Sequence, residues 1–151
     1  MKVSKNFDLR EFVSPGVYRK WGDSSIWFLD QRVITLAQFI RDRFNYSGMI
    51  CNWHWWYKGC GFQKYQYSGF RSPSCTIGAK LGQHRFGRGL DYKMMGKPNN
   101  GADELREDIE GHFSMYKERG LTTIEHRNFA PTWCHMDTRW TGIDELFIVK
   151  P

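Results

Sequence analysis

His84 and Asp91 lie on either side of a short glycine-rich turn. Gly87 and Gly89 fall between them and disfavour a helix, so the segment is expected to be a loop that enters a strand. A neutral imidazole and a hard carboxylate brought together in this way are good ligands for zinc. The pair therefore indicates a metal site that needs a further ligand.

A third ligand is offered by a segment near the C-terminus. If that segment is a strand, Trp133, His135 and Asp137 share one face, and Cys134 and Met136 share the other. His135 then supplies the third ligand, and the Asp137 carboxylate lies beside it, where it can orient the imidazole ring. Two histidines and one carboxylate leave one position of a tetrahedral zinc open for water, which is typical of a catalytic site.

Hydrolysis by such a site also needs a group that manages the protons of the attacking water. Glu125 precedes His135 across an expected hairpin, so it can project into the same cleft. We take Glu125 as the general base and keep Asp137 in reserve. A solvated strand carboxylate is the alternative interpretation of Glu125.

The elements that must position these residues follow from the spacing of apolar side chains. Helices are expected over 29–44, where Asp30 suits the helix dipole, and over 102–119, where Gly120 stops the helix. Short strands are expected over 49–56, 121–125, 132–138 and 146–149. Helices first and strands last favour an α+β fold, here one domain over 1–151. The irregular stretch over 58–100 is of the kind that is usually functional.

Composition limits the function classes. The chain has 151 residues, 40% of them hydrophobic, and a net charge of +6. This charge favours polyanionic partners, but the basic residues are scattered and form no arm for nucleic acid. No apolar run approaches the roughly 20 residues that span a bilayer, and no apolar segment follows Lys2 and Lys5 as in a secretory signal. We expect a soluble monomer, without membrane or nucleic-acid partners, that is cytoplasmic as synthesised.

The four cysteines form no C-x-x-C pair. In a reducing cytosol we expect Cys51, Cys60, Cys75 and Cys134 to be buried thiols. The alternative is a structural zinc held by Cys51, His54 and Cys60, with a fourth ligand that the sequence does not identify.

Three motifs resemble the D-Ala-D-Ala metallopeptidases, which share the hedgehog/DD-peptidase fold with lysostaphin-type zinc peptidases. The family patterns are S-G-[YF]-R-S, then S-x-H-x-x-G-x-A-x-D, then a W-x-H or V-H-x-D strand. The matching segments are Ser68-Gly-Phe-Arg-Ser-Pro73, His84 to Asp91, and Trp133-Cys-His-Met-Asp137. The opening Asn6 to Phe12 and the helix before Asn52-Trp53 look like the phage-type branch, so the resemblance covers nearly the whole chain.

The resemblance implies a small antiparallel sheet with helices packed on one side. It implies zinc held by His84, Asp91 and His135, and hydrolysis of peptide bonds in peptidoglycan stems or cross-links. It also implies that Arg71 contacts the substrate near the scissile carbonyl, because a planar guanidinium can hold a carboxylate or a developing oxyanion. Gln83 and Asp137 are expected to contact the metal ligands and orient them.

The chain departs from the family pattern at three positions. Gly82 stands where the family has serine, and Gly89 where it has alanine. Several members place the base three residues before the last histidine, and here that residue is Thr132, which cannot hold a proton near neutral pH. The departure at Thr132 is the reason that Glu125 is taken as the base.

The sequence leaves several alternatives open. An endolysin-like phage enzyme, made in the host cytoplasm and acting on the wall after release, can be an endopeptidase or a D,D-carboxypeptidase. A zinc-stabilised scaffold without catalysis and a basic, aromatic module that binds single-stranded nucleic acid are the other functions. Trp53, Trp55 and Trp56 can line a groove or belong to the core. The segment 58–67 can be a flap or a plain surface loop.

Overall fold

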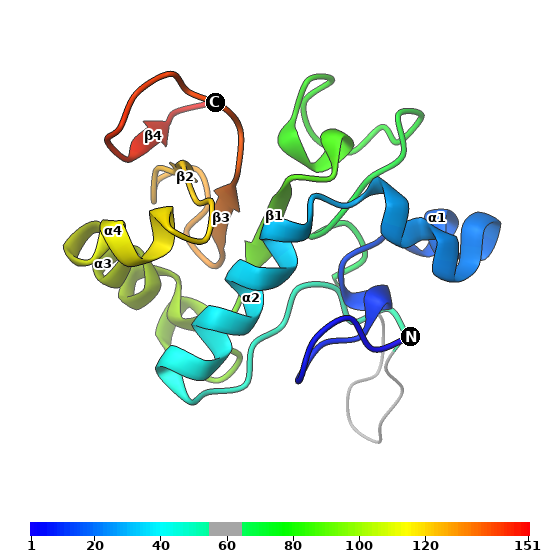
Figure 1. The fold of residues 1–151 in the computed structure, drawn as a ribbon, viewed down its shortest axis with the longest axis horizontal. Coiled ribbons are helices and arrows are strands. Elements are labelled where there is room, and N and C mark those ends of the chain that lie inside the picture. Colours follow the sequence, from blue (N-terminus) through cyan, green and yellow to red (C-terminus); the bar gives the residue numbers. More distant parts are fainter. Residues whose placement is uncertain (55–64) are drawn as a thin grey trace.

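The computed structural model describes residues 1–54 and 65–151, and it has the expected α+β class (Figure 1). The α-helices are α1 (Pro15–Trp21), α2 (Gln31–Phe44), α3 (Ala102–Gly111) and α4 (Phe113–Lys117). The strands are β1 (Gly89–Tyr92), β2 (Thr123–Glu125), β3 (Cys134–Asp137) and β4 (Phe147–Val149). Four short 3-10 segments are η1 (Leu9–Glu11), η2 (Gly22–Phe28), η3 (Gln83–Phe86) and η4 (Pro98–Gly101).

The four strands form one mixed sheet in the order β1-β3-β2-β4. Strand β3 pairs antiparallel with both β1 and β2, whereas β4 pairs parallel with β2. The expectation of an antiparallel sheet is therefore wrong at this edge. Asp137 and Phe147 both lie beside Thr123, so the chain leaves β3, passes β2 and enters β4 at the same end of the sheet.

Helix α2 confirms the helix expected over 29–44, apart from its start. It runs across the middle of the molecule beside β1 (Figure 1). The Asp30 side chain accepts a hydrogen bond from the Arg32 backbone N–H at 3.0 Å, so Asp30 caps the helix and is not part of it. The helix ends at Asn45, whose φ of 45° is left-handed.

The single helix expected over 102–119 is two helices, α3 and α4. His112 lies between them with φ −133° and ψ 34°, which is not helical, and it follows Gly111, a poor helix former. Leu105, Ile109 and Tyr116 are still buried on the inner side. The break therefore leaves the apolar spacing intact and could not be inferred from it.

The strand expected over 49–56 is not formed in its described part. Met49 makes an isolated bridge to Lys93, and the neighbouring edge of β1 is taken by Ser68, whose carbonyl accepts the Asp91 N–H at 2.8 Å. Trp53 packs against the main core, and its Nε1 donates to the Val13 carbonyl at 2.8 Å. Trp55, Trp56 and most of the segment 58–67 lie outside the described residues.

The two faces of the sheet differ in character. Leu90, Tyr92, Cys134, Met136 and Ile124 join the apolar side chains of α2 and α3 in one core. Residues of alternate parity point the other way. They are Asp91, His135, Asp137 and Glu125, the residues that the sequence singled out for chemistry.

The cysteines are only partly as expected. Cys51 and Cys134 are buried free thiols, and burial raises their pKa to about 11 and about 12. Cys75 is partly exposed, so the expectation of a buried thiol is wrong there, because it lies in the surface stretch between Arg71 and His84. Cys60 lies outside the described residues, and with it the alternative zinc site.

Candidate metal centre

Three side chains from separate parts of the chain converge on one point. The Nε2 atom of His84 lies 3.2 Å from the Asp91 Oδ1 atom and 3.2 Å from the His135 Nδ1 atom. The His135 Nδ1 and Asp91 Oδ1 atoms are 2.9 Å apart. Ligand atoms on a tetrahedral zinc, with bonds of about 2.0–2.1 Å, lie about 3.3 Å from one another. The three atoms thus have nearly the spacing of one face of a tetrahedron, as expected for this ligand set.

His84 is positioned by a tight turn of the backbone. It lies in η3, between Gly82 and Gly87, and its Nδ1 atom is 2.9 Å from the Gly69 carbonyl oxygen. Gly87 has a φ of 70°, and a Cβ atom there would lie 1.7 Å from the Phe28 carbonyl oxygen. Only glycine therefore allows the close approach of this turn to the residues before α2.

His135 and Asp91 are positioned by strand pairing. They are direct partners in the antiparallel register of β3 and β1, so both side chains point to the same face. The Lys93 ammonium, which is buried, donates to the Asp91 carbonyl and to the Ser68 hydroxyl, each at 2.9 Å. It thereby fixes β1 against the segment that also carries Gly69.

The outer nitrogen of each imidazole faces an acceptor. His84 Nδ1 faces the Gly69 carbonyl, and His135 Nε2 lies 3.3 Å from the Asp137 Oδ2 atom. With the ring protons on these outer atoms, the inner nitrogens present lone pairs to each other and to Asp91. Three buried lone pairs at this distance can be satisfied by a proton or by a metal ion between them, and two nitrogens with one oxygen are compatible with zinc.

The pKa values reflect this concentration of acceptors. Burial opposes the charge of Asp91, but the neighbouring histidines outweigh it and hold its pKa well below the usual range. Burial lowers the pKa of His84. Burial also acts to lower the pKa of His135, yet hydrogen bonds with Asp137 and Asp91 raise it to about 9. Each inner atom thus attracts positive charge, either a proton or a metal ion.

His84, Asp91 and His135, together the metal group, line a cleft of about 480 Å³. Arg71, Gln83 and Glu125 line this cleft together with the three ligands. Continuing the register of β2 and β3 by one residue places Glu125 opposite His135, on the same face. Glu125 is half-buried, and this burial raises its pKa. Thr132, three residues before His135, is exposed.

Arg71 is held firmly beside the ligands. Its Nε atom donates to the Tyr67 carbonyl at 2.6 Å, and its Nη2 atom lies 3.5 Å from the Asp91 Oδ2 atom. Gly78 has a φ of 76°, and a Cβ atom there would lie 2.3 Å from the Arg71 Nη1 atom. The loop after Arg71 is therefore shaped around the guanidinium.

Gln83 and Asp137 have different surroundings, although both are expected to orient the metal ligands. Asp137 is fully buried behind His135 and contacts it, as expected of an orienting carboxylate. Gln83 lines the cleft, and its Oε1 atom accepts a hydrogen bond from Arg88 Nε at 2.8 Å. Within the described part of the chain, no hydrogen bond joins this side chain to His84, Asp91 or His135.

Sequence reasoning missed two contributors. The Gly69 carbonyl carries no side-chain signal and became visible only in the structure. Arg139 binds Asp137 through Nε at 2.8 Å and Nη2 at 2.5 Å, and it lines the cleft. Its spacing of two from Asp137 on an extended segment was a signal that could have found it.

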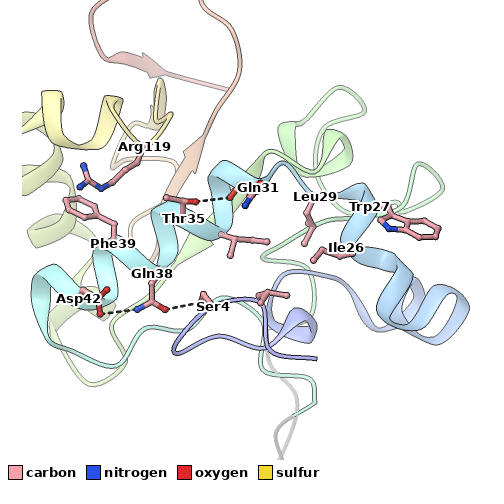
Figure 2. A pocket seen from close by; sticks show the side chains of 12 residues that line it. Ser4, Ile26, Trp27, Leu29, Gln31, Thr35, Gln38, Phe39, Asp42 and Arg119 are labelled. Carbon is pink, nitrogen blue, oxygen red and sulfur yellow. Dashed lines mark hydrogen bonds between the residues drawn. The ribbon is translucent and has the colours of Figure 1, made fainter.

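A larger hollow of about 760 Å³ lies along the outer side of α2 (Figure 2). Gln38 at its centre accepts from the Ser4 hydroxyl at 2.9 Å and donates to Asp42 at 3.0 Å, so these polar groups satisfy one another. The described residues contain one group of histidine, cysteine and carboxylate side chains spaced to hold a metal, and it lies in the smaller cleft. The smaller cleft is therefore the candidate functional site.

No family model, curated protein or solved structure matches this chain. Among the described residues, the helices are too short and too polar to span a bilayer.

Proposed function

We propose that this chain is a zinc-dependent peptidase that hydrolyses peptide bonds in bacterial peptidoglycan, in the manner of an endolysin. The observation that carries the proposal is the triangle of His84, Asp91 and His135, with sides of 2.9–3.2 Å, in the lining of a cleft. A structural zinc is surrounded by four protein ligands. The described residues supply three, which favours an open, catalytic site.

The residues around the triangle suit hydrolysis. A zinc ion bound there would supply Lewis-acid activation of water and of the scissile carbonyl. Glu125, with its raised pKa, can take a proton from the attacking water and deliver it to the leaving amine. Arg71 offers a fixed positive charge at the side of Asp91, where an oxyanion can develop.

The choice of peptidoglycan is supported by the motif resemblance and by the net charge of +6, which suits an acidic cell-wall polymer. The proposal includes both endopeptidase and D,D-carboxypeptidase activity. We propose that the protein acts as a monomer on stem peptides or cross-links after release from the cytoplasm in which it is made.

The test is zinc analysis of the purified protein, followed by mass spectrometry of digested cell wall. We expect about one zinc per chain and released peptide fragments. His84→Ala and His135→Ala should each lose the metal and the activity. His112→Ala, at an exposed histidine between α3 and α4, is the matched control and should retain both. Full activity in either ligand variant would contradict the proposal.

Glu125→Gln separates metal binding from catalysis. It should retain zinc and lose activity by about 100-fold or more, because the glutamine side chain cannot accept the proton. Glu118→Gln, on the exposed end of α4, is the control. Retained turnover in Glu125→Gln would move the role of base to Asp137.

A zinc-stabilised scaffold is the second candidate, and one observation favours it. Thr132 is exposed and cannot serve as base, and the reserve base Asp137 is fully buried and paired with Arg139, so the proposed catalysis depends mainly on Glu125. Chelation that lowers the thermal stability of a protein without any peptide release would indicate the scaffold. Salt-dependent binding of oligonucleotides by a protein that purifies without zinc would instead indicate the nucleic-acid module.

A further inference from the structure

The guanidinium of Arg71 is already engaged at all three nitrogens. Nε donates to the Tyr67 carbonyl at 2.6 Å, Nη1 donates to the Ile77 carbonyl at 3.4 Å, and Nη2 lies 3.5 Å from Asp91. Arg71 can contribute its charge to the cleft. A new two-pronged contact with a ligand would, however, require it to give up bonds that it now makes.

Arg139 lines the same cleft and is engaged on one side only. Its Nε and Nη2 atoms bind the two Asp137 oxygens at 2.8 and 2.5 Å, and its Nη1 atom makes no hydrogen bond to any described residue. A guanidinium carries five N–H donors and has two edges that match a carboxylate. The edge formed by Nε and Nη2 is used on Asp137. The edge formed by Nη1 and Nη2 is available at a side chain that is 26% exposed.

Asp137 makes this edge rigid. The Asp137 carboxylate is fully buried and accepts from the Arg139 backbone N–H at 3.1 Å as well as from the guanidinium, and it contacts His135 on its other side. Arg139 thus has little freedom to swing away. A preorganised donor pair loses less entropy on binding than a flexible one.

The charges around the cleft favour an anion once a metal is bound. Three carboxylates and three cationic side chains give the site a net charge of about zero. A bound divalent ion would therefore make the net charge positive. The carboxylates are Asp91, Glu125 and Asp137, and the cations are Arg71, Lys93 and Arg139.

We infer that Arg139 is a specificity-determining residue that binds a carboxylate of the substrate through its Nη1–Nη2 edge. The inference rests on the proposed function and narrows its substrate class to acidic peptides. Stem peptides carry two carboxylates that meet this requirement, that of the γ-linked D-glutamate and that of the terminal D-alanine. Binding one of them at Arg139 would fix which bond lies over the metal group.

The experiment measures peptide binding by calorimetry in a Glu125→Gln background, so that bound peptides are not consumed. The probes are the stem tetrapeptide L-Ala-γ-D-Glu-L-Lys-D-Ala, its C-terminal amide, and its form with D-isoglutamine. One of the two amidations should weaken binding about tenfold in the zinc-loaded protein, because a charge-assisted pair is lost. The same amidation should have little effect after Arg139→Gln, and Arg139→Lys should lie between.

Two controls make the result specific. Arg127→Gln removes an exposed arginine of the β2–β3 loop that does not line the cleft, and it should keep the full tenfold discrimination. Zinc content is measured in each variant, and Arg139→Lys retains a cation beside Asp137 in case the glutamine variant folds poorly. Equal effects of amidation with and without Arg139 would overturn the role of this residue alone. No binding of any probe by the zinc-loaded parent would overturn the choice of peptidoglycan and the inference with it.

Discussion

The two histidines of the metal group are held by different kinds of force. His84 lies on a turn, and its outer nitrogen faces a neutral backbone carbonyl at Gly69. His135 lies on a strand, and its outer nitrogen faces the charged Asp137, which Arg139 holds in turn. Burial lowers the pKa of His84, whereas the carboxylates raise that of His135 to about 9. Two candidate ligands with the same expected role are therefore held by different interactions.

The comparison separates shape from charge. The His84 side is fixed by close packing of backbone on backbone, so it should be sensitive to added atoms and insensitive to charge. The His135 side is fixed by a chain of ion pairs, so it should be sensitive to charge and to pH. Each side can then be disturbed by a change that leaves the other nearly untouched.

Gly87→Ala should disturb the His84 side most strongly. The new Cβ atom would lie 1.7 Å from the Phe28 carbonyl oxygen at a residue with a φ of 70°. We expect a loss of roughly 4 kcal/mol in the free energy of unfolding, measured by urea denaturation of the zinc-free protein. Gly16→Ala, where a Cβ atom would meet nothing within 4 Å, should change stability by less than about 1 kcal/mol. Equal effects of the two substitutions would show that the turn is not sterically fixed.

The pH dependence of stability should separate the two histidines by sign. His135 has a folded pKa of about 9, above its unfolded value of about 6.5. It therefore stabilises the zinc-free fold fully below pH 6.5, and this contribution is lost as the pH rises through 9. His84, with a lowered pKa, contributes in the opposite sense and destabilises the fold as the pH falls below its unfolded value.

The measurement is the free energy of unfolding from pH 5 to pH 9.5 for the zinc-free parent, His84→Gln and His135→Gln. The difference between the parent and His135→Gln should fall by about 3 kcal/mol from pH 6 to the upper end of this range. The difference between the parent and His84→Gln should instead rise with pH. Slopes of the same sign for both variants would contradict the comparison.

The side chains of the candidate metal site could be predicted from the sequence. Alternation along 133–137 correctly separated His135 and Asp137 from Cys134 and Met136, because strand side chains alternate between faces. Asp91 and His84 converge with His135 as the glycine-rich turn indicated. The helical spacing that predicted α2 depends on local contacts and is equally readable.

The backbone contacts of the site and the long-range strand pairing could not be predicted from the sequence. The Gly69 carbonyl that orients His84 has the same chemistry as every other carbonyl in the chain. The parallel edge at β4 depends on the path that the chain takes past β2, and no residue type encodes that path. The break at His112 leaves Leu105, Ile109 and Tyr116 buried, so the apolar pattern continues across it.

Asp137→Asn is the mildest and most selective way to test the charged side. Asparagine has the shape of aspartate, and its oxygen can still accept the His135 N–H. Its NH2 group then faces the Arg139 backbone N–H and Nε donors, so the substitution removes the charge and part of the pairing with Arg139. We expect zinc affinity, measured by competition with a chelator, to fall about 10- to 100-fold while zinc-free stability changes less than in Gly87→Ala. Asp144→Asn, at a side chain that is 95% exposed, should leave affinity unchanged. Undiminished zinc affinity in Asp137→Asn would contradict the expected role of charge. It would mean that an uncharged hydrogen bond is enough to hold His135, as it is for His84.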